Sequence, residues 1–259
     1  MQSLADRLIC TAACSRRFLE QESRSEIARF ILSRQNPGGG FRGKSAESDL
    51  YYTVFAAAGL KALGWRIPVW PLWKYIRPFG LGEELDLVHL CCLIRLRTAF
   101  PMTGKTRRQL FRNMEELPAE SAYDFFLKQL TGDCLGIARL PAAPQPVSLA
   151  DPTPNLAAAV IVNRTSEKVA AGVLLNRVCR SGGFAATDQL NSADLLSTAT
   201  ALFALRILRA DLDPVRRPCM EFIESLWRDS GGFAGHVTDE FEDVEYTFYA
   251  LLSLGCLME

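Results

Sequence analysis

The chain has 259 residues, of which 49% are hydrophobic and 22% are charged, and its 29 basic and 29 acidic residues give a formal net charge of zero. This balance lacks the basic excess of most nucleic-acid-binding proteins, so no nucleic-acid partner is expected. The N-terminal segment carries Asp6 and Arg7 where a signal peptide would need an apolar run. No apolar stretch reaches the length of a membrane span. We therefore expect a cytoplasmic protein with ample hydrophobic material for a core.

The first helices follow from the spacing of apolar residues. Residues 3–14 predict a short N-terminal helix, and residues 22–34 predict an amphipathic one whose apolar side chains recur every three or four positions. Asp49 is well placed to begin the next helix, because an acidic group favours the positive end of the helix dipole. This helix is expected to run through Leu63 and to stop at Gly64.

The middle of the chain follows this pattern less closely. A tryptophan-rich connector with two prolines is expected over residues 65–73, and Asp86 then begins another apolar helix. Residues 103–116 and 121–132 predict two more helices. Five prolines lie within residues 141–154, so this stretch is expected to be a loop or an extended segment. Because helical repeats stand on both sides of it, we interpret it as an excursion within one domain.

One unit occurs three times: two glycines and a phenylalanine, followed eight or ten residues later by an aspartate that leads an apolar helix. A helix, a glycine-punctuated loop and a second helix, repeated along a chain, are typical of an all-helical array. The six expected starts of inner helices are Asp49, Asp86, Asp124, Asn155, Asp194 and Asp243. We expect one domain over residues 1–259, a closed ring of helix pairs with essentially no sheet. One outer helix between residues 121 and 165 should be short or missing.

The last repeat has a pattern that can be compared with a known family. It reads Gly231-Gly-Phe-Ala-Gly-His, then Asp243, then Tyr246-Thr-Phe-Tyr-Ala. This pattern resembles the repeat of protein prenyltransferase β subunits and, more loosely, that of squalene and triterpene cyclases, strongly over residues 22–64 and 166–257. The resemblance implies an all-α (α/α)6 toroid. In that family the inner helices begin at the mouth of a funnel lined by aromatic side chains, which holds an isoprenoid chain.

The resemblance also implies where a zinc site would lie. The prenyltransferases bind a catalytic zinc through an aspartate and a cysteine two residues later in the fifth inner helix, and a histidine three residues after the aspartate of the sixth. The corresponding residues here are Asp194, Leu196 and Tyr246. Leucine and tyrosine do not replace a thiolate and an imidazole as zinc ligands. We therefore expect no metal and no cofactor.

The cyclases instead use a D-x-D-D stretch whose central carboxylic acid protonates an alkene, and the chain has no such stretch. Its nearest acidic cluster spans residues 239–245, with five carboxyl groups in seven positions. Crowded carboxylates raise one another's pKa, so one of them could act as an acid. The alternative is a solvated loop in which Asp243 caps the last helix.

Two further groups of residues have a functional and a structural interpretation. Asp86, His89 and Cys92 stand at i, i+3 and i+6, roughly along one helix face, where they could shuttle protons or hold a metal. The alternative is a hydrogen-bonded core histidine. Tyr52 and Tyr246 hold equivalent positions in the first and last repeats. They would either contact a polyene through their ring faces or pack between neighbouring hairpins.

Parallel inner helices would bring their N-terminal ends together at one rim, and this rim is the expected site. The candidate catalytic residues are Asp86, His89, Asp194 and Asp243. The candidate substrate-binding residues are Asp49, Tyr52, Glu245 and Tyr246. The favoured function is a metal-independent enzyme that acts on an isoprenoid or another hydrophobic metabolite in the funnel. The alternative is a toroid without catalysis that binds a lipid, peptide or protein, and a homodimer or a partner subunit is compatible with both.

Overall fold

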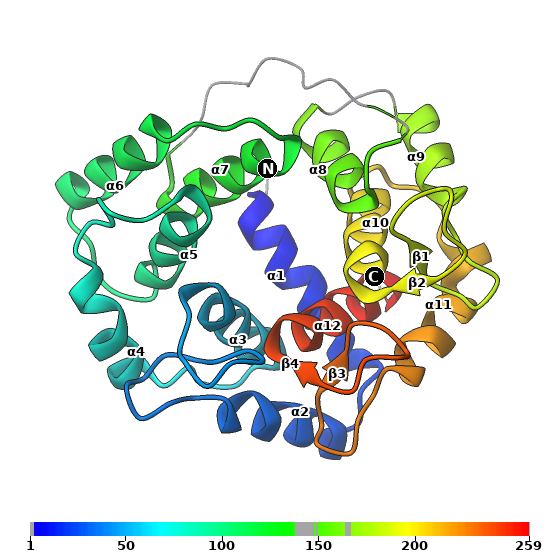
Figure 1. The fold of residues 1–259 in the computed structure, drawn as a ribbon, viewed down its shortest axis with the longest axis horizontal. Coiled ribbons are helices and arrows are strands. Elements are labelled where there is room, and N and C mark those ends of the chain that lie inside the picture. The colour runs from blue at the N-terminus through cyan, green and yellow to red at the C-terminus, as the bar shows by residue number, and fades with distance from the viewer. Residues whose placement is uncertain (1–2, 138–147, 149, 164–166, 259) are drawn as a thin grey trace.

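A computed structural model of the chain describes residues 3–137, 148, 150–163 and 167–258. Its helices form two concentric rings around one axis (Figure 1). The inner ring contains α3 (Leu50–Leu63), α5 (Leu87–Arg97), α7 (Ala122–Leu135), α8 (Thr153–Asn163), α10 (Leu195–Ile207) and α12 (Val244–Met258). The outer ring contains α2 (Gln21–Ser33), α4 (Val69–Ile76), α6 (Gly104–Glu116), α9 (Glu167–Leu175) and α11 (Asp213–Ser225). The architecture is an all-α toroid, which confirms the expected fold class.

The two rings differ in how their helices bury side chains. In α12 every residue from Thr247 to Leu257 is buried, because this inner helix packs against α1, α3, α10 and the outer helix α11. An outer helix is amphipathic instead, and the buried residues of α2 are Ile27, Ala28, Phe30 and Ile31. None of the helices in the described part of the chain is long and apolar enough to cross a bilayer.

A threonine four residues after the capping aspartate holds each copy of the repeat together. In the last repeat the Asp243 carboxylate accepts the Tyr246 N–H at 2.9 Å and caps α12. The Thr247 hydroxyl donates to the Asp243 carbonyl oxygen at 2.6 Å and accepts the Phe233 N–H at 3.2 Å. The same two bonds are made in the other two copies by Thr53 and Thr198. The loop, the cap and the helix are therefore fixed to one another.

Two very short hairpins precede the last two inner helices. β1 (Phe184–Ala185) pairs with β2 (Ala193–Asp194), and β3 (Phe233–Ala234) pairs with β4 (Glu242–Asp243), both in antiparallel register. Each pairing joins the phenylalanine of the glycine motif to the capping aspartate. Apart from isolated bridges, these hairpins are the β structure of the described residues, in line with the expectation of essentially no sheet.

The connector predicted over residues 65–73 is wrong in its second half, where α4 begins at Val69. Pro71 lies in the first turn of α4. The N–H groups of a first turn have no partner within the helix, so a proline there removes no hydrogen bond and is compatible with a helix start. On the face of α4 that packs against the rest of the protein, Leu72 and Ile76 are completely buried, and they hold the helix in place.

Two predicted helix starts also need correction. Asp124 does not begin α7, because Ser121 is the N-cap and Asp124 completes its capping box three residues later. α8 begins at Thr153, two residues before Asn155. α7 and α8 lie side by side in the inner ring, and no outer helix stands between them among the described residues. Most of the proline-rich stretch 141–154 lies outside the described residues.

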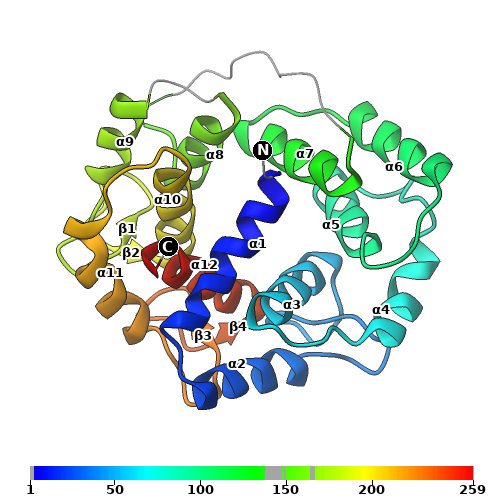
Figure 2. The same ribbon diagram turned by 180° about the vertical axis from the view of Figure 1, so that it is seen from behind.

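α1 (Leu4–Cys14) crosses the end of the toroid at which the inner helices finish (Figure 2). Gly255 of α12 permits this close crossing, because a Cβ at that position would overlap the carbonyl oxygen of Thr11. The Asp133 carboxylate near the end of α7 accepts the Leu4 N–H at 2.7 Å. Two 3-10 turns, η1 (Ser15–Arg17) and η2 (Arg77–Phe79), follow α1 and α4. We call this end of the toroid the base, and the end at which the inner helices begin the rim.

Candidate functional site

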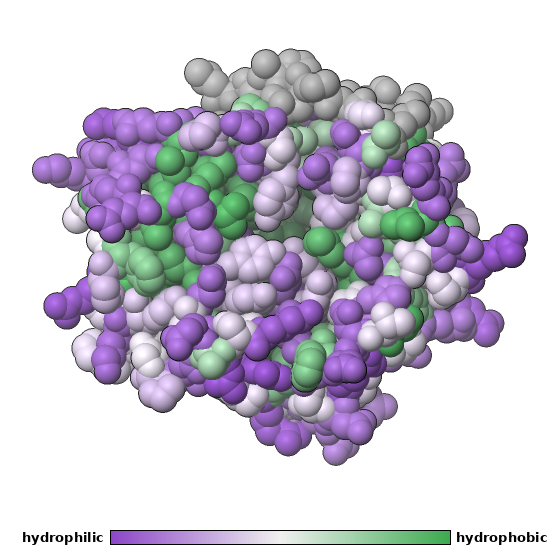
Figure 3. Space-filling view, viewed as in Figure 1, coloured by the Kyte–Doolittle hydropathy of each residue, from purple (hydrophilic) through white to green (hydrophobic). Residues whose placement is uncertain are grey.

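A cavity of about 330 Å³ lies inside the inner ring. All six inner helices contribute to its wall, and Leu8 of α1 lines it at the base. The wall contains seven aromatic side chains, Tyr51, Phe55, Tyr123, Phe126, Phe203, Phe248 and Tyr249. Figure 3 looks onto the rim and shows hydrophobic residues in a recess near the middle of this face. The volume is near the lower end of the roughly 300–1,000 Å³ that is typical of small-molecule sites.

One carboxyl group stands behind this aromatic wall. The Tyr51 hydroxyl donates to Glu245 Oε1 at 2.6 Å, and Tyr249 also hydrogen-bonds to this carboxyl group. Burial raises the pKa of Glu245 to about 7, against the opposing hydrogen bond from Tyr51. Burial and the neighbouring Glu245 charge also raise the pKa of Tyr51 well above its usual range. Both tyrosines line the cavity, so an acid that titrates near neutrality is one hydrogen bond away from it.

The five carboxyl groups of residues 239–245 differ in their burial and in their hydrogen-bond partners. Asp239 accepts a loop N–H, and Glu242 forms an ion pair of 3.0 Å with the outer helix α2. Glu240 is exposed to solvent. Asp243 caps α12 and is only 2% exposed, and this burial raises its pKa above the ordinary value. Among the five, only Glu245 is hydrogen-bonded to the wall of the cavity.

His89 lies between two aspartates that cap neighbouring inner helices. Its Nδ1 is 2.7 Å from Asp86 Oδ2 on its own helix α5, and its Nε2 is 3.6 Å from Asp49 Oδ1, the cap of α3. Burial acts to lower the pKa of His89, but the hydrogen bond and the charge of Asp86, together with Asp49, outweigh it and raise the pKa. Cys92 is buried in the core, and burial raises its pKa to about 12. No group of three or more metal-ligating side chains is found among the described residues.

Tyr52 and Tyr246 make the same contact in the first and last repeats. The ring of Tyr52 lies against Gly43 and that of Tyr246 against Gly235, so closely that a Cβ on either glycine would overlap the ring. The Lys44 ammonium group is 5.7 Å from the centre of the Tyr246 ring. Neither tyrosine lines the cavity. Their contacts favour packing between the loop and the helix over contact with a ligand deep in the cavity.

The three positions of the family's zinc site do not fit a zinc ion in this chain. Asp194 caps α10 by accepting the Ser197 N–H at 2.8 Å. Leu196 faces the cavity, and its side chain carries no atom that could bind a metal. Tyr246 is packed on a glycine, and burial raises the pKa of its phenol to about 12.

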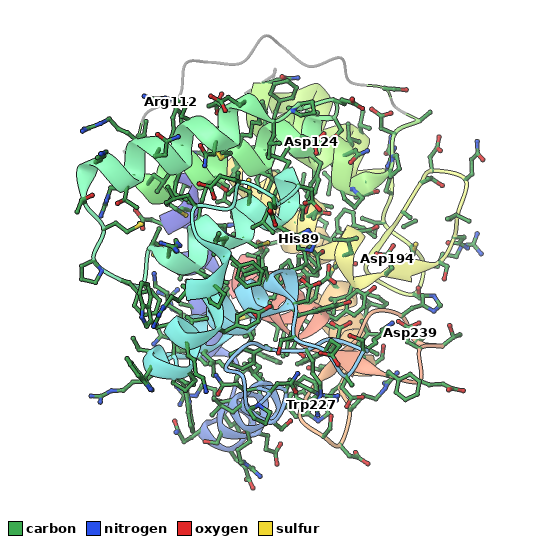
Figure 4. All side chains as sticks on the ribbon, turned by 60° about the vertical axis from the view of Figure 1, so that its left-hand side comes forward. His89, Arg112, Asp124, Asp194, Trp227 and Asp239 are labelled. Carbon is green, nitrogen blue, oxygen red and sulfur yellow. The ribbon has the colours of Figure 1, made fainter. Side chains whose placement is uncertain are left out.

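All eight site residues expected from the sequence lie at the rim, either as helix caps or in the first turn of an inner helix. In Figure 4, His89, Asp194 and Asp239 lie towards the same side of the molecule, near the loops that precede the inner helices. Arg112 on the outer helix α6 lies away from them (Figure 4). The structure brings His89 into contact with both Asp86 and Asp49, and it separates Glu245 from the others by turning it inward.

The residues of the cavity wall were not singled out by sequence reasoning. A repeat alignment contains the signal that would have found them, because the positions two and six residues after the capping aspartate face the axis. These positions hold Tyr51 and Phe55 in the first copy, and Leu196 and Thr200 in the second copy, which leads the fifth inner helix α10, and all four line the cavity. In the last copy they hold Glu245 and Tyr249, so the register alone would have directed Glu245 inward.

Comparison with known proteins agrees with this geometry. No curated protein matches the chain. The family model described as the prenyltransferase alpha-alpha toroid domain matches residues 8–92 and 155–259, which is well over half of the chain. The unmatched part between them contains α6 and α7, where the repeat pattern of the sequence is weakest. The chain belongs to the prenyltransferase alpha-alpha toroid family.

Proposed function

We propose that the chain is a metal-independent enzyme that acts on an isoprenoid or another hydrophobic metabolite held in the central cavity. The observation that carries the proposal is the Tyr51–Glu245 hydrogen bond of 2.6 Å at the wall of an apolar cavity. A carboxyl group with a pKa of about 7 is present in both protonation states near neutral pH, which suits general acid–base catalysis.

In this proposal the protonated Glu245 carboxyl donates to the Tyr51 oxygen, the reverse of the hydrogen bond in the structure, while the Tyr51 O–H passes its own proton to a double bond of the substrate. The rings of Phe55, Phe248 and Tyr249 surround the resulting cation and stabilise it through their faces. Loss of a proton from the cation returns that proton to the Glu245 carboxylate. Substrate and product are then isomers, and no oxidant, metal or second substrate is required.

The rim residues take part at the mouth of the cavity. Asp86 and His89 form a proton-exchanging pair, and Asp194 and Asp243 are proposed to meet a polar group of the substrate that projects from the cavity. Asp49, Tyr52 and Tyr246 form the entrance, where the two rings offer apolar edges beside the acids. Because these acids also cap helices, their replacement is expected to change stability as well as activity.

The test begins with mass spectrometry of an organic extract of the purified protein, which identifies a bound hydrophobic molecule. That molecule, or a series of acyclic isoprenoids if none is found, is then incubated with the protein and its variants. Glu245→Gln and Tyr51→Phe should lower the rate by about 10²- to 10⁴-fold, the usual contribution of a general acid or base. Glu240→Gln, on the exposed side of the same acidic run, should keep the full rate.

The second candidate is a toroid that binds such a molecule without converting it. The observation in its favour is the loss of donor atoms at two of the three zinc positions, Leu196 and Tyr246. A molecule that co-purifies and is recovered unchanged after incubation would support this candidate. Equal rates for the Glu245→Gln variant and the unchanged protein would overturn the proposed acid–base role.

A further inference from the structure

One segment of the outer surface is both aromatic and basic. Three of the large hydrophobic side chains that are exposed lie within six positions, with exposed fractions of 37% for Trp65, 51% for Val69 and 74% for Trp70. The exposed cations of the same segment are Arg66, Lys74 and Arg77. We call these six residues the aromatic–basic patch.

The helix α4 presents part of this patch along one face. Trp70, Lys74 and Arg77 stand at i, i+4 and i+7, so their side chains follow one stripe down the helix and into the turn η2. The opposite stripe, Leu72 and Ile76, is completely buried. The exposure of Trp70 is therefore not a consequence of a loosely packed helix, because the helix is anchored by its other face.

The chain segment that contains the patch carries charge of one sign. Between Asp49 and Glu83 the chain contains no acidic residue, although it contains four cations, Lys61, Arg66, Lys74 and Arg77. No ion pair joins these four cations to an acid among the described residues. In a chain with zero formal net charge, the patch segment is therefore locally positive; Asp6 and Asp133 line the same cavity as Lys61, which is not part of the patch.

A second cavity of about 320 Å³ opens beside the patch, between α1, α3 and α5. Ile67, which lies within the patch segment, and Lys61 line it. Its wall reaches Leu8 and Arg95, which also line the central cavity. A surface that meets the patch would therefore also meet the outer end of a cavity that shares wall residues with the candidate site.

We propose that the aromatic–basic patch binds the surface of an anionic lipid bilayer. Tryptophan rings are favoured at the level of the lipid head groups, because they have an apolar body and a polar N–H. Each lysine or arginine near an anionic leaflet adds about 1 kcal/mol, or about a fivefold increase in affinity. Lys74 favours a bilayer over a protein interface, because the core of a protein interface is depleted of lysine although it is enriched in tryptophan and arginine.

The test is co-sedimentation with vesicles of phosphatidylcholine, alone or mixed with phosphatidylglycerol. The unchanged protein should bind the anionic vesicles at least about tenfold more tightly, and added salt should weaken this binding. The double variant Lys74→Gln/Arg77→Gln should lose about 25-fold in affinity for anionic vesicles. The double variant Trp65→Ser/Trp70→Ser should lose binding to both vesicle types, and its tryptophan fluorescence should no longer shift when anionic vesicles are added.

Two control variants test whether the loss of any exposed cations, or of any exposed hydrophobic side chain, would have the same effect as changes in the patch. Lys105→Gln/Arg108→Gln removes two exposed cations from α6, and Phe241→Ser removes a side chain that is 64% exposed on a rim loop. Both controls should bind anionic vesicles as the unchanged protein does. Equal losses in the controls and the patch variants, or no sedimentation with anionic vesicles, would overturn the proposal. A dimer in sedimentation velocity that Trp70→Ser dissociates would assign the patch to a second copy of the chain and would also overturn it.

Discussion

The six inner helices begin at the rim of the toroid and end at its base, and different residues stabilise these two ends. At the rim, aspartates cap α3, α5, α10 and α12, as Asp194 caps α10 through the Ser197 N–H. At the base, the last turns of α3 and α5 carry Lys61 and Arg95, cations that suit the negative end of the helix dipole. The base is also crossed by α1, whereas loops and the two short hairpins lie at the rim.

Helix capping accounts for most of the acids at the rim, but it does not account for Glu245. A carboxylate that accepts the N–H groups of its own helix is explained by helix capping. Glu245 accepts no such bond and is hydrogen-bonded to Tyr51 of the neighbouring helix α3 instead. The charge of the rim is therefore mainly structural, and Glu245 is the exception on which the proposed function depends.

The base is the place where the comparison predicts the largest loss of stability. Gly255→Val should lower the free energy of unfolding by about 3 kcal/mol or more, because a side chain there overlaps the backbone of α1 at Thr11. Urea unfolding should show one cooperative transition at a lower midpoint, as expected if residues 1–259 form a single domain. Gly172→Ala is the matched control, since nothing lies within 4 Å of its added Cβ, and it should be neutral or slightly stabilising. A separate early transition for half of the chain would contradict the single domain.

At the rim, the largest effect should be the pH dependence that Glu245 contributes. Its pKa is raised from 4.5 to about 7 in the folded chain, so the folded state holds this proton more tightly than the unfolded state. The associated stability is complete below pH 4.5 and is lost as the pH rises through 7, by about 3 kcal/mol. Glu245→Gln should not show this loss between pH 5 and pH 8 in urea unfolding. Glu240→Gln should keep it, and an unchanged loss in Glu245→Gln would show that another group is responsible.

A smaller effect should follow from the threonine that links loop and cap. Thr247→Val removes the hydroxyl that accepts the buried Phe233 N–H, so the free energy of unfolding should fall by about 1–2 kcal/mol. Thr200→Val is the control, because its hydroxyl donates only to carbonyl groups of its own helix. If both variants lose the same stability, the link between the loop and the helix contributes nothing beyond helix propensity.

The repeat pattern made the toroid predictable, whereas predicting the cavity wall also required knowing which positions of the repeat face the axis. The glycine motif and the capping aspartates identify Asp49, Asp86, Asp194 and Asp243 as helix starts, because capping is local chemistry that a sequence records. The start at Asp124 was wrong because an aspartate serves equally well at the third position of a capping box, where Ser121 is the cap.

The candidate site was harder to predict because it depends on which side chains of an inner helix point to the axis. Asp243 and Glu245 are two residues apart in one acidic run, and composition does not tell which of them points to the axis. The structure shows that Asp243 caps the helix and that Glu245 contacts Tyr51 of the neighbouring inner helix α3. The helix α4 was missed for a similar reason, because Pro71 and the tryptophans are typical of a loop unless the first turn of a helix is considered.

The smallest predicted effect concerns the one place at the rim where two helix caps share a partner. His89 contacts Asp86 and approaches Asp49, and these acids raise its pKa above 6.5 despite its partial burial. The stability from this protonated contact is complete below pH 6.5 and is lost as the pH rises through the raised pKa. The side chain is 37% exposed, so solvent screening limits the contribution to about 0.5 kcal/mol. His89→Asn should therefore be slightly less stable than the unchanged protein at pH 5.5 in low salt, and equally stable at pH 8. Because exposed charges are screened, high salt should remove the difference at pH 5.5, and a difference that persists in high salt at both pH values would show that His89 acts through packing instead.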